Sequence, residues 1–230
     1  MTKLLIVNPN STASMTAKIG EAAHRAARAG TEVLAVNDPQ APPSIQGFYD
    51  VAQCLPALLS QLEGHSDVDA AIIACFDDTG LDAARCAIDV PVIGIGEAAF
   101  HVASMLSCKF SVVTTLRRSV PGIEANLMRY GLSARCGRVR ASDVPVLALE
   151  RRDPVMMKKI TDEIERAIDE DQAEAIVLGC AGMAELAAEL SHQYGLPVIE
   201  GVSCAVALAE ALASLGARTS RIGGYARPGK

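Results

Sequence analysis

The chain has 230 residues, half of them apolar, and a formal net charge of −6 that is spread along the sequence. This distribution lacks the basic stripe and aromatic platform that nucleic-acid binding needs, which excludes a nucleic-acid partner. With four Phe, four Tyr and no Trp, the core has to be built from small aliphatic side chains. That mixture is typical of parallel strands covered by helices, so the composition predicts an α/β protein.

The N-terminal segment runs through a short apolar stretch at 4–7 directly into the polar residues 8–12. This stretch is far too short for a signal peptide or a membrane span. We therefore expect a cytoplasmic protein that does not contact membranes. The seven cysteines are an odd number without close CxxC pairs, and we expect reduced thiols.

Short β-branched runs alternate with longer helical patterns along the chain, as in repeated βα units around parallel sheets. One helical pattern opens with Asp153-Pro154, a good N-cap followed by proline at the first helical position. The predicted strands span 4–7, 32–36, 70–74, 91–95, 110–114, 137–140, 175–179 and 197–200. The predicted helices include 15–29, 51–62, 120–130, 153–168 and a last one at about 203–215.

An internal repeat divides the chain into two similar halves. The strand that ends at Cys75 recurs 105 positions later in the strand that ends at Cys180. Nearly the same offset relates 3–7 to 109–113 and Pro-Val-Ile at 91–93 to 197–199. Agreement at three places indicates duplication. We expect two pseudo-symmetric lobes, each a four-stranded parallel sheet flanked by helices, with the active site in the cleft between them.

The first lobe is expected to comprise residues 1–97 together with a C-terminal helix, 205–217, that returns to it. The second lobe is expected to comprise residues 98–204. The polar tail at 218–230 contains Gly-Gly and Pro-Gly pairs, and we expect it to be flexible.

Cys75 and Cys180 each fall where a predicted strand ends and a helix follows, the place where open α/β sheets collect ligands. A helix N-terminus lowers a thiol pKa from about 8.5 toward neutrality. One thiolate and one thiol could then act on opposite faces of a carbon acid, as a two-base racemase requires. The charges of Asp77 and Asp78 would oppose a thiolate at Cys75. Taken singly, each cysteine could also be a small buried hydrophobe.

Other polar residues at the strand ends have two interpretations each. The segment 8–12 and its counterpart Thr114-Thr115 could hold substrate carbonyl oxygens or cap helices. Asp77 and Asp78 could form a catalytic carboxylate pair, although a cap on the following helix is the better interpretation of one of them.

The sequence points to no metal and no cofactor. The four histidines are scattered and no HExxH motif occurs. Residues 94–99 match the G-x-G-x-x-A dinucleotide fingerprint, but they follow the fourth strand and lack an acidic residue about twenty positions later. The remaining cysteines are expected to fill the core: Cys54, Cys86, Cys108, Cys136 and Cys204.

Taken together, the segments 8–12, 74–81, 112–115 and 179–183 resemble the hydantoin racemases, within the wider aspartate/glutamate/hydantoin racemase superfamily. The resemblance runs from about residue 3 to residue 215. It implies two α/β lobes and two cysteines that act as acid and base without pyridoxal phosphate or metal. It also implies a homo-oligomer.

The residues beside the cysteines distinguish this chain from the amino-acid branch of that superfamily. Aspartate and glutamate racemases follow their cysteines with Asn-Thr and Thr-His, whereas here Phe76-Asp77 and Ala181-Gly182 stand there. Such a site fits a neutral ring better than a zwitterion. We predict racemization of 5-monosubstituted hydantoins at ring carbon 5 by Cys75 and Cys180. The predicted substrate-binding residues are Asn10, Phe76, Asp77, Asp78, Thr79, Thr114, Thr115, Ala181, Gly182 and Met183.

Three other functions remain open. Allantoin racemization is the same chemistry on a ureido-substituted ring. Maleate-type isomerization would also use paired cysteines, but this apolar site is ill suited to a dicarboxylate. A two-lobed module that binds a small molecule without chemistry would have no need for two thiols at matching positions.

Overall fold

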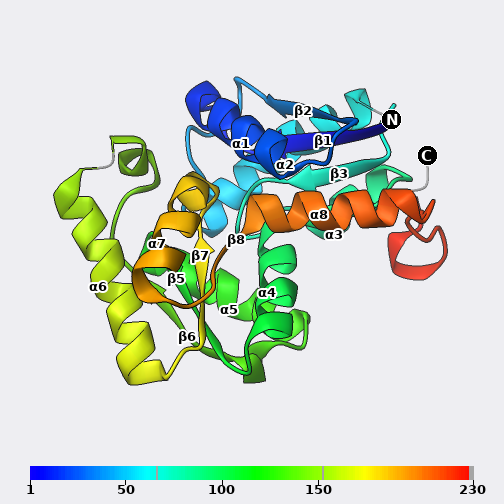
Figure 1. Cartoon of the computed structure of the whole chain (residues 1–230). Coiled ribbons are helices and arrows are strands. Elements are labelled where there is room, and N and C mark those ends of the chain that lie inside the picture. The colour runs from blue at the N-terminus through cyan, green and yellow to red at the C-terminus, as the bar shows by residue number, and fades with distance from the viewer. Residues whose placement is uncertain (66, 152, 228–230) are drawn as a thin grey trace.

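The computed structural model describes residues 1–65, 67–151 and 153–227 and contains two four-stranded parallel sheets (Figure 1). The strand order is β2-β1-β3-β4 in one sheet and β6-β5-β7-β8 in the other, so the two halves share one topology. The strands are β1 Thr2–Asn8, β2 Thr31–Asn37, β3 Ala70–Ile73, β4 Val92–Gly94, β5 Phe110–Thr114, β6 Cys136–Ala141, β7 Ala175–Gly179 and β8 Val198–Glu200. All eight predicted strands and the predicted α/β class are confirmed.

Helices flank both sheets. They are α1 Ala13–Ala26, α2 Phe48–Gly64, α3 Leu81–Ala87, α4 Ile95–Leu106, α5 Val120–Arg129, α6 Pro154–Asp171, α7 Ala187–Tyr194 and α8 Gly201–Ser214. Short 3-10 helices lie at Arg117–Ser119, Ser133–Arg135, Val146–Arg151, Ala181–Leu186 and Gly223–Tyr225. The Asp153 carboxylate caps α6 as predicted, because it accepts the N–H groups of Val155 and Met156. In the described part of the chain, every helix is too short or too polar to cross a membrane.

The side chains of each strand point alternately to the two faces of its sheet, and this separates the core into layers. On β1, Leu4 and Ile6 face a central core that also takes in the second sheet, whereas Leu5 and Val7 face an outer core under α2 and α3. Successive side chains of a strand point to opposite faces, and both faces are covered, so the whole strand is apolar. The second lobe has its own outer core under α6 and α7.

Each half of the chain gives its last helix to the other lobe. Helix α4 follows β4 but packs against β7 and β8, whereas α8 follows β8 and packs against β1, β3 and β4. Figure 1 shows α8 in orange beside the first sheet and α4 in green beside the second. The helices also contact each other. At their starts Gly201 lies so near Ile95 that a Cβ would overlap the Ile95 carbonyl oxygen, so glycine is required there.

The C-terminal segment, which we expect to be a flexible tail, makes hydrogen bonds to the first lobe. The Thr219 N–H donates to the Asp89 carbonyl oxygen at 2.9 Å, and the Arg221 guanidinium reaches the Asp89 carboxylate at 2.6 Å. Arg221 also donates to the carbonyl oxygens of Arg85 and Cys86 at the end of α3. These unpaired helix-end carbonyls attract a cation, which holds the tail to the first lobe. Residues 228–230 of the predicted tail lie outside the described residues.

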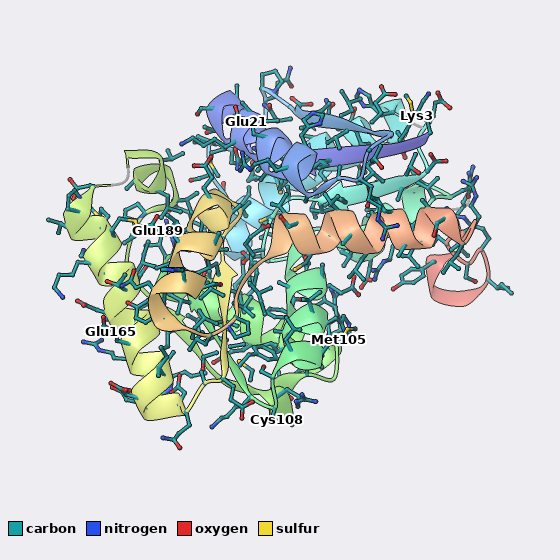
Figure 2. All side chains as sticks on the ribbon, in the orientation of Figure 1. Lys3, Glu21, Met105, Cys108, Glu165 and Glu189 are labelled. Atoms are coloured by element: carbon teal, nitrogen blue, oxygen red, sulfur yellow. The ribbon has the colours of Figure 1, made fainter. Side chains whose placement is uncertain are left out.

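Four of the five other cysteines are buried or half-buried, as expected for core filling. Cys108 is the exception, because it is exposed at the edge of the second lobe (Figure 2). It lies in the turn before β5, where its N–H donates to Glu174 at 2.6 Å.

Candidate active site

Cys75 and Cys180 lie just beyond the carboxyl ends of β3 and β7, which hold the same position in the two sheets. Both line one cavity between the lobes, with about 390 Å³ of empty space. The first lobe contributes Asn10, Met15, Ile45, Ala74, Cys75, Phe76 and Asp77, and the second contributes Thr114, Thr115, Ser119, Val146, Gly179, Cys180 and Ala181.

Six of the ten predicted binding residues border this cavity, namely Asn10, Phe76, Asp77, Thr114, Thr115 and Ala181. Four further lining residues were not predicted from the sequence: Met15, Ile45, Ser119 and Val146. Ile45 follows β2 and Val146 follows β6, the equivalent strand of the other half. Comparing the loops after equivalent strands could have identified this pair.

The other four predicted binding residues lie outside the cavity. The Asp78 carboxylate accepts hydrogen bonds from Gly96, Glu97 and Tyr130. Met183 is fully buried in the outer core of the second lobe. Thr79 is also buried and Gly182 borders a second cavity, but both still contact a cysteine sulfur.

The two sulfurs have matching hydrogen-bond partners. The Cys75 Sγ accepts from the backbone N–H of Asp77, and the Cys180 Sγ accepts from the backbone N–H of Gly182. In both lobes the donor is the second residue after the cysteine. The Thr79 hydroxyl adds a further donor to Cys75 at 3.4 Å. Such donors stabilise a thiolate.

Both thiols nevertheless have a raised pKa, contrary to the expectation from a helix N-terminus. Burial raises the pKa of Cys180 to about 11 and raises that of Cys75 well above its usual value. The helix after Cys75 begins only at Leu81, too far for its dipole to act strongly on the sulfur. Loss of hydration therefore dominates.

Asp77 is the carboxylate that lines the cavity. Its negative charge further raises the pKa of Cys75 and that of Cys180. Burial raises the pKa of Asp77 itself to about 6. At neutral pH its charge therefore opposes thiolate formation on both sides of the cavity.

The polar groups at the cavity wall differ in how far they are already hydrogen-bonded. The Thr114 hydroxyl donates to the Gly179 carbonyl oxygen at 2.9 Å and ties β5 to β7. The Asn10 amide oxygen accepts from Asn8 and from the Thr12 N–H, while its NH₂ group has only a 3.9 Å contact with the Met15 sulfur. Thr115 is 3% exposed, and its hydroxyl forms no hydrogen bond with another of the described residues. Asn10 and Thr115 therefore retain donors for a ligand.

A metal site does not emerge from the described residues, since no group of three His, Cys, Asp or Glu side chains there could hold an ion. The dinucleotide-like segment 94–99 forms the end of β4 and the start of α4. Its glycines lie against the Asp78 carboxylate.

Comparisons with known proteins give a consistent result. The sequence model of the Asp/Glu/Hydantoin racemase family matches residues 4–209. A hydantoin racemase of Rhizobium meliloti is 50% identical over 97% of this chain and 93% of its own. The structure of an allantoin racemase from Klebsiella pneumoniae superposes with a TM-score of 0.97 at 43% identity, covering 100% of this chain and 95% of that one. The aspartate racemase of Picrophilus torridus, at 16% identity and a TM-score of 0.65, covers 96% and 97% and shares the fold.

Proposed function

The chain belongs to the Asp/Glu/hydantoin racemase family and is an isomerase, and we propose that it racemizes 5-monosubstituted hydantoins without a cofactor. Cys75 and Cys180 act as the two bases, one on each face of ring carbon 5. The cavity carries this proposal, because each lobe contributes one cysteine and no Lys, Arg or His is among the described residues that line it. A wall without cations suits a neutral ring better than a dicarboxylate.

The reaction moves one proton off ring carbon 5 and another proton onto it. A thiolate at one cysteine takes the ring proton, so the C–H bond breaks, an S–H bond forms, and the electron pair moves onto the adjacent carbonyl oxygen. The opposite thiol then protonates the carbon from the other face and becomes a thiolate. A raised thiol pKa makes each thiolate scarcer at neutral pH but more basic, which suits a weak carbon acid.

The enolate oxygen needs hydrogen-bond donors fixed before the reaction begins. The Thr115 hydroxyl and the Asn10 NH₂ group have no strong acceptor of their own among the described residues. We assign these two groups to the ring carbonyls. Of the backbone N–H groups predicted at 77–79 and 181–182, those of Asp77 and Gly182 already donate to the cysteine sulfurs, and that of Asp78 donates to the Cys75 carbonyl oxygen.

A second cavity supports an apolar substituent at ring position 5. It has about 540 Å³ of empty space, and Gly182 and Ala148 are among the residues that border it. An added Cβ on Gly182 would lie 3.7 Å from the Cys180 Sγ. Its other lining residues are Lys18, Leu149, Met156, Met157, Ile160, Glu185 and Leu186. Most of these are apolar, so an alkyl or aromatic group fits there.

Allantoin is the second candidate substrate. The similarity to an allantoin racemase structure favours it, as do Lys18 and Glu185, which could contact a ureido group at the second cavity. The two substrates differ only in the group at ring position 5, so both are compatible with the same pair of thiols.

Polarimetry with single enantiomers of 5-benzylhydantoin, 5-isopropylhydantoin and allantoin tests the substrate. We expect loss of rotation with the alkyl and aryl hydantoins at a higher kcat/KM than with allantoin. A higher kcat/KM for allantoin would select the second candidate. No loss of rotation with any of the three would refute the proposed function.

Single serine variants test the two-base mechanism, because a hydroxyl is a far poorer base than a thiolate. Net racemization should fall by orders of magnitude in Cys75→Ser and in Cys180→Ser. In D₂O each variant should exchange the ring proton of one enantiomer only, with opposite preferences. Cys204→Ser is the matched control, since this half-buried cysteine lies on α8. Near-normal racemization in either active-site variant would show that its cysteine only packs.

Two further predictions go with this function. Following the family resemblance, we propose a homo-oligomer, which light scattering on the purified protein would test. We also propose a cytoplasmic location, which fractionation of the source cells would test.

A further inference from the structure

The loop that carries Cys75 is held at a single buried carboxylate, that of Asp78. Asp78 is 3% exposed and has a positive φ of 49°, a backbone conformation that residues other than glycine rarely adopt. It stands between Asp77 and Thr79, whose N–H and hydroxyl are the two donors to the Cys75 sulfur. The conformation at Asp78 therefore sets both of these contacts.

The Asp78 carboxylate reaches out of its own loop to three donors. It accepts the N–H of Gly96 at 2.9 Å and the N–H of Glu97 at 2.7 Å, both in the first turn of α4. It also accepts the hydroxyl of Tyr130, at the end of α5, at 2.8 Å. Both helices pack in the second lobe, so the carboxylate ties the Cys75 loop across the lobe interface.

The glycines of the segment 94–99 make room for this carboxylate. A Cβ on Gly94 would overlap the Asp78 Oδ1, and a Cβ on Gly96 would lie 2.8 Å from its Oδ2. The Gly-x-Gly pattern here thus cradles a carboxylate of the protein itself. A helix N-terminus with unpaired N–H groups stabilises that negative charge.

Among its described residues, the second lobe has no equivalent of this arrangement. Glu200, the last residue of β8, caps α8 by itself and accepts the N–H groups of Val202 and Ser203. Gly94 is its counterpart at the end of β4. By the repeat offset Met183 corresponds to Asp78, and it is buried among apolar side chains. The cap of α8 is therefore separate from the loop that carries Cys180.

We propose that Asp78 is a positioning residue for Cys75 alone, holding that sulfur in place by fastening its loop to α4 and α5. A second tie supports this assignment, because the Asn126 amide of α5 donates to the Asp77 carbonyl oxygen at 2.8 Å. Asp78 itself stays outside the cavity and touches no substrate. The inference rests on the proposed function, in which each cysteine serves one enantiomer.

Asp78→Asn keeps the shape of the side chain but replaces one carboxylate oxygen with an NH₂ group. That group faces N–H or O–H donors and cannot accept their hydrogen bonds. The readout is exchange of the ring proton in D₂O, measured for each enantiomer separately. The Cys180→Ser variant identifies the enantiomer whose proton Cys75 removes. For that enantiomer we expect kcat for exchange to fall tenfold or more with KM changed less than threefold. Exchange of the other enantiomer should stay within threefold of the unmodified enzyme.

Glu200→Gln is the matched control, because it weakens the equivalent cap of α8 without touching either cysteine loop. It should alter the two exchange reactions equally. Tyr130→Phe removes one of the three donors and should give a smaller loss with the same enantiomer preference, which keeps the test valid if Asp78→Asn does not fold. Equal losses for both enantiomers, or no loss, in a folded variant would overturn the proposal.

Amide hydrogen exchange followed by mass spectrometry separates this inference from the proposed function. In Asp78→Asn the peptide covering 75–81 should exchange faster, while the peptide covering 180–187 should not change. This result is independent of the substrate, whereas failure of the proposed function would appear as absent ring-proton exchange in the unmodified protein. Unchanged protection at 75–81 would also overturn the positioning role.

Discussion

The charge of Asp77 gives a quantitative test of the electrostatics at the active site. With a pKa of about 11 for Cys180, on the order of one molecule in a thousand carries that thiolate at pH 8. Asp77→Asn removes a like charge next to both sulfurs and should lower both pKa values by about one unit. Because only the thiolate is alkylated, iodoacetamide should label both cysteines about tenfold faster at pH 8. Racemization should gain less, about threefold, since a less basic thiolate abstracts protons more slowly.

Timed alkylation across pH 5 to 11, read by peptide mass spectrometry, follows each cysteine separately. Each labelling rate should rise with pH through the thiol pKa, and the curves of the variant should lie at lower pH. The two proteins should converge below about pH 6, where Asp77 is protonated. Asp50→Asn is the control, because Asp50 raises the pKa of Cys54 but is not among the causes that act on Cys75 or Cys180. Identical curves for Asp77→Asn and the unmodified protein, or labelling of Cys180 with a pKa near 8.5, would refute this reasoning.

Three further predictions concern packing and specificity. Gly94→Ala places a methyl group against the Asp78 carboxylate and should lower the free energy of unfolding in urea by about 2–3 kcal/mol; an unchanged midpoint would contradict the tight contact. Arg140→Met removes the two hydrogen bonds, at 2.6 and 2.7 Å, that the arginine donates to the buried Asp171 carboxylate. It should lower the free energy of unfolding by about 3–5 kcal/mol in the same assay. A loss below 1 kcal/mol would show that water replaces the arginine. Met157→Trp should fill the second cavity and raise KM for 5-benzylhydantoin at least tenfold, but leave KM for 5-methylhydantoin within threefold; equal effects on the two would place the substituent elsewhere.

The sequence was most informative where a physical pattern repeats. The apolar runs locate the eight strands, and a single offset relates Cys75 to Cys180 before any coordinates are considered. The duplication also predicted that both cysteines would face one cleft, and both line one cavity, whereas the order of the strands was not predicted.

Properties that depend on distant contacts could not be predicted in this way. The predicted direction of the thiol pKa shifts was wrong, because burial of the sulfurs outweighs the local helix geometry. The partners of Asp78 lie 18, 19 and 52 positions away, beyond the reach of a local capping rule. The order of the C-terminal segment similarly depends on ion pairs with Asp89, more than a hundred residues earlier.

The exchange of α4 and α8 makes each lobe depend on the chain segment that belongs to the other. Removing residues 201–230 would leave the second sheet intact but expose the apolar face of the first, where α8 packs. Neither half can therefore hide its own hydrophobic surface, and the two must complete their folding in one cooperative event. A half-length chain with this topology could cover the apolar face of its sheet only as a pair of subunits that exchange their last helices. The single chain joins that pair covalently through the turn between α4 and β5. Every molecule therefore contains one copy of each wall of the cavity.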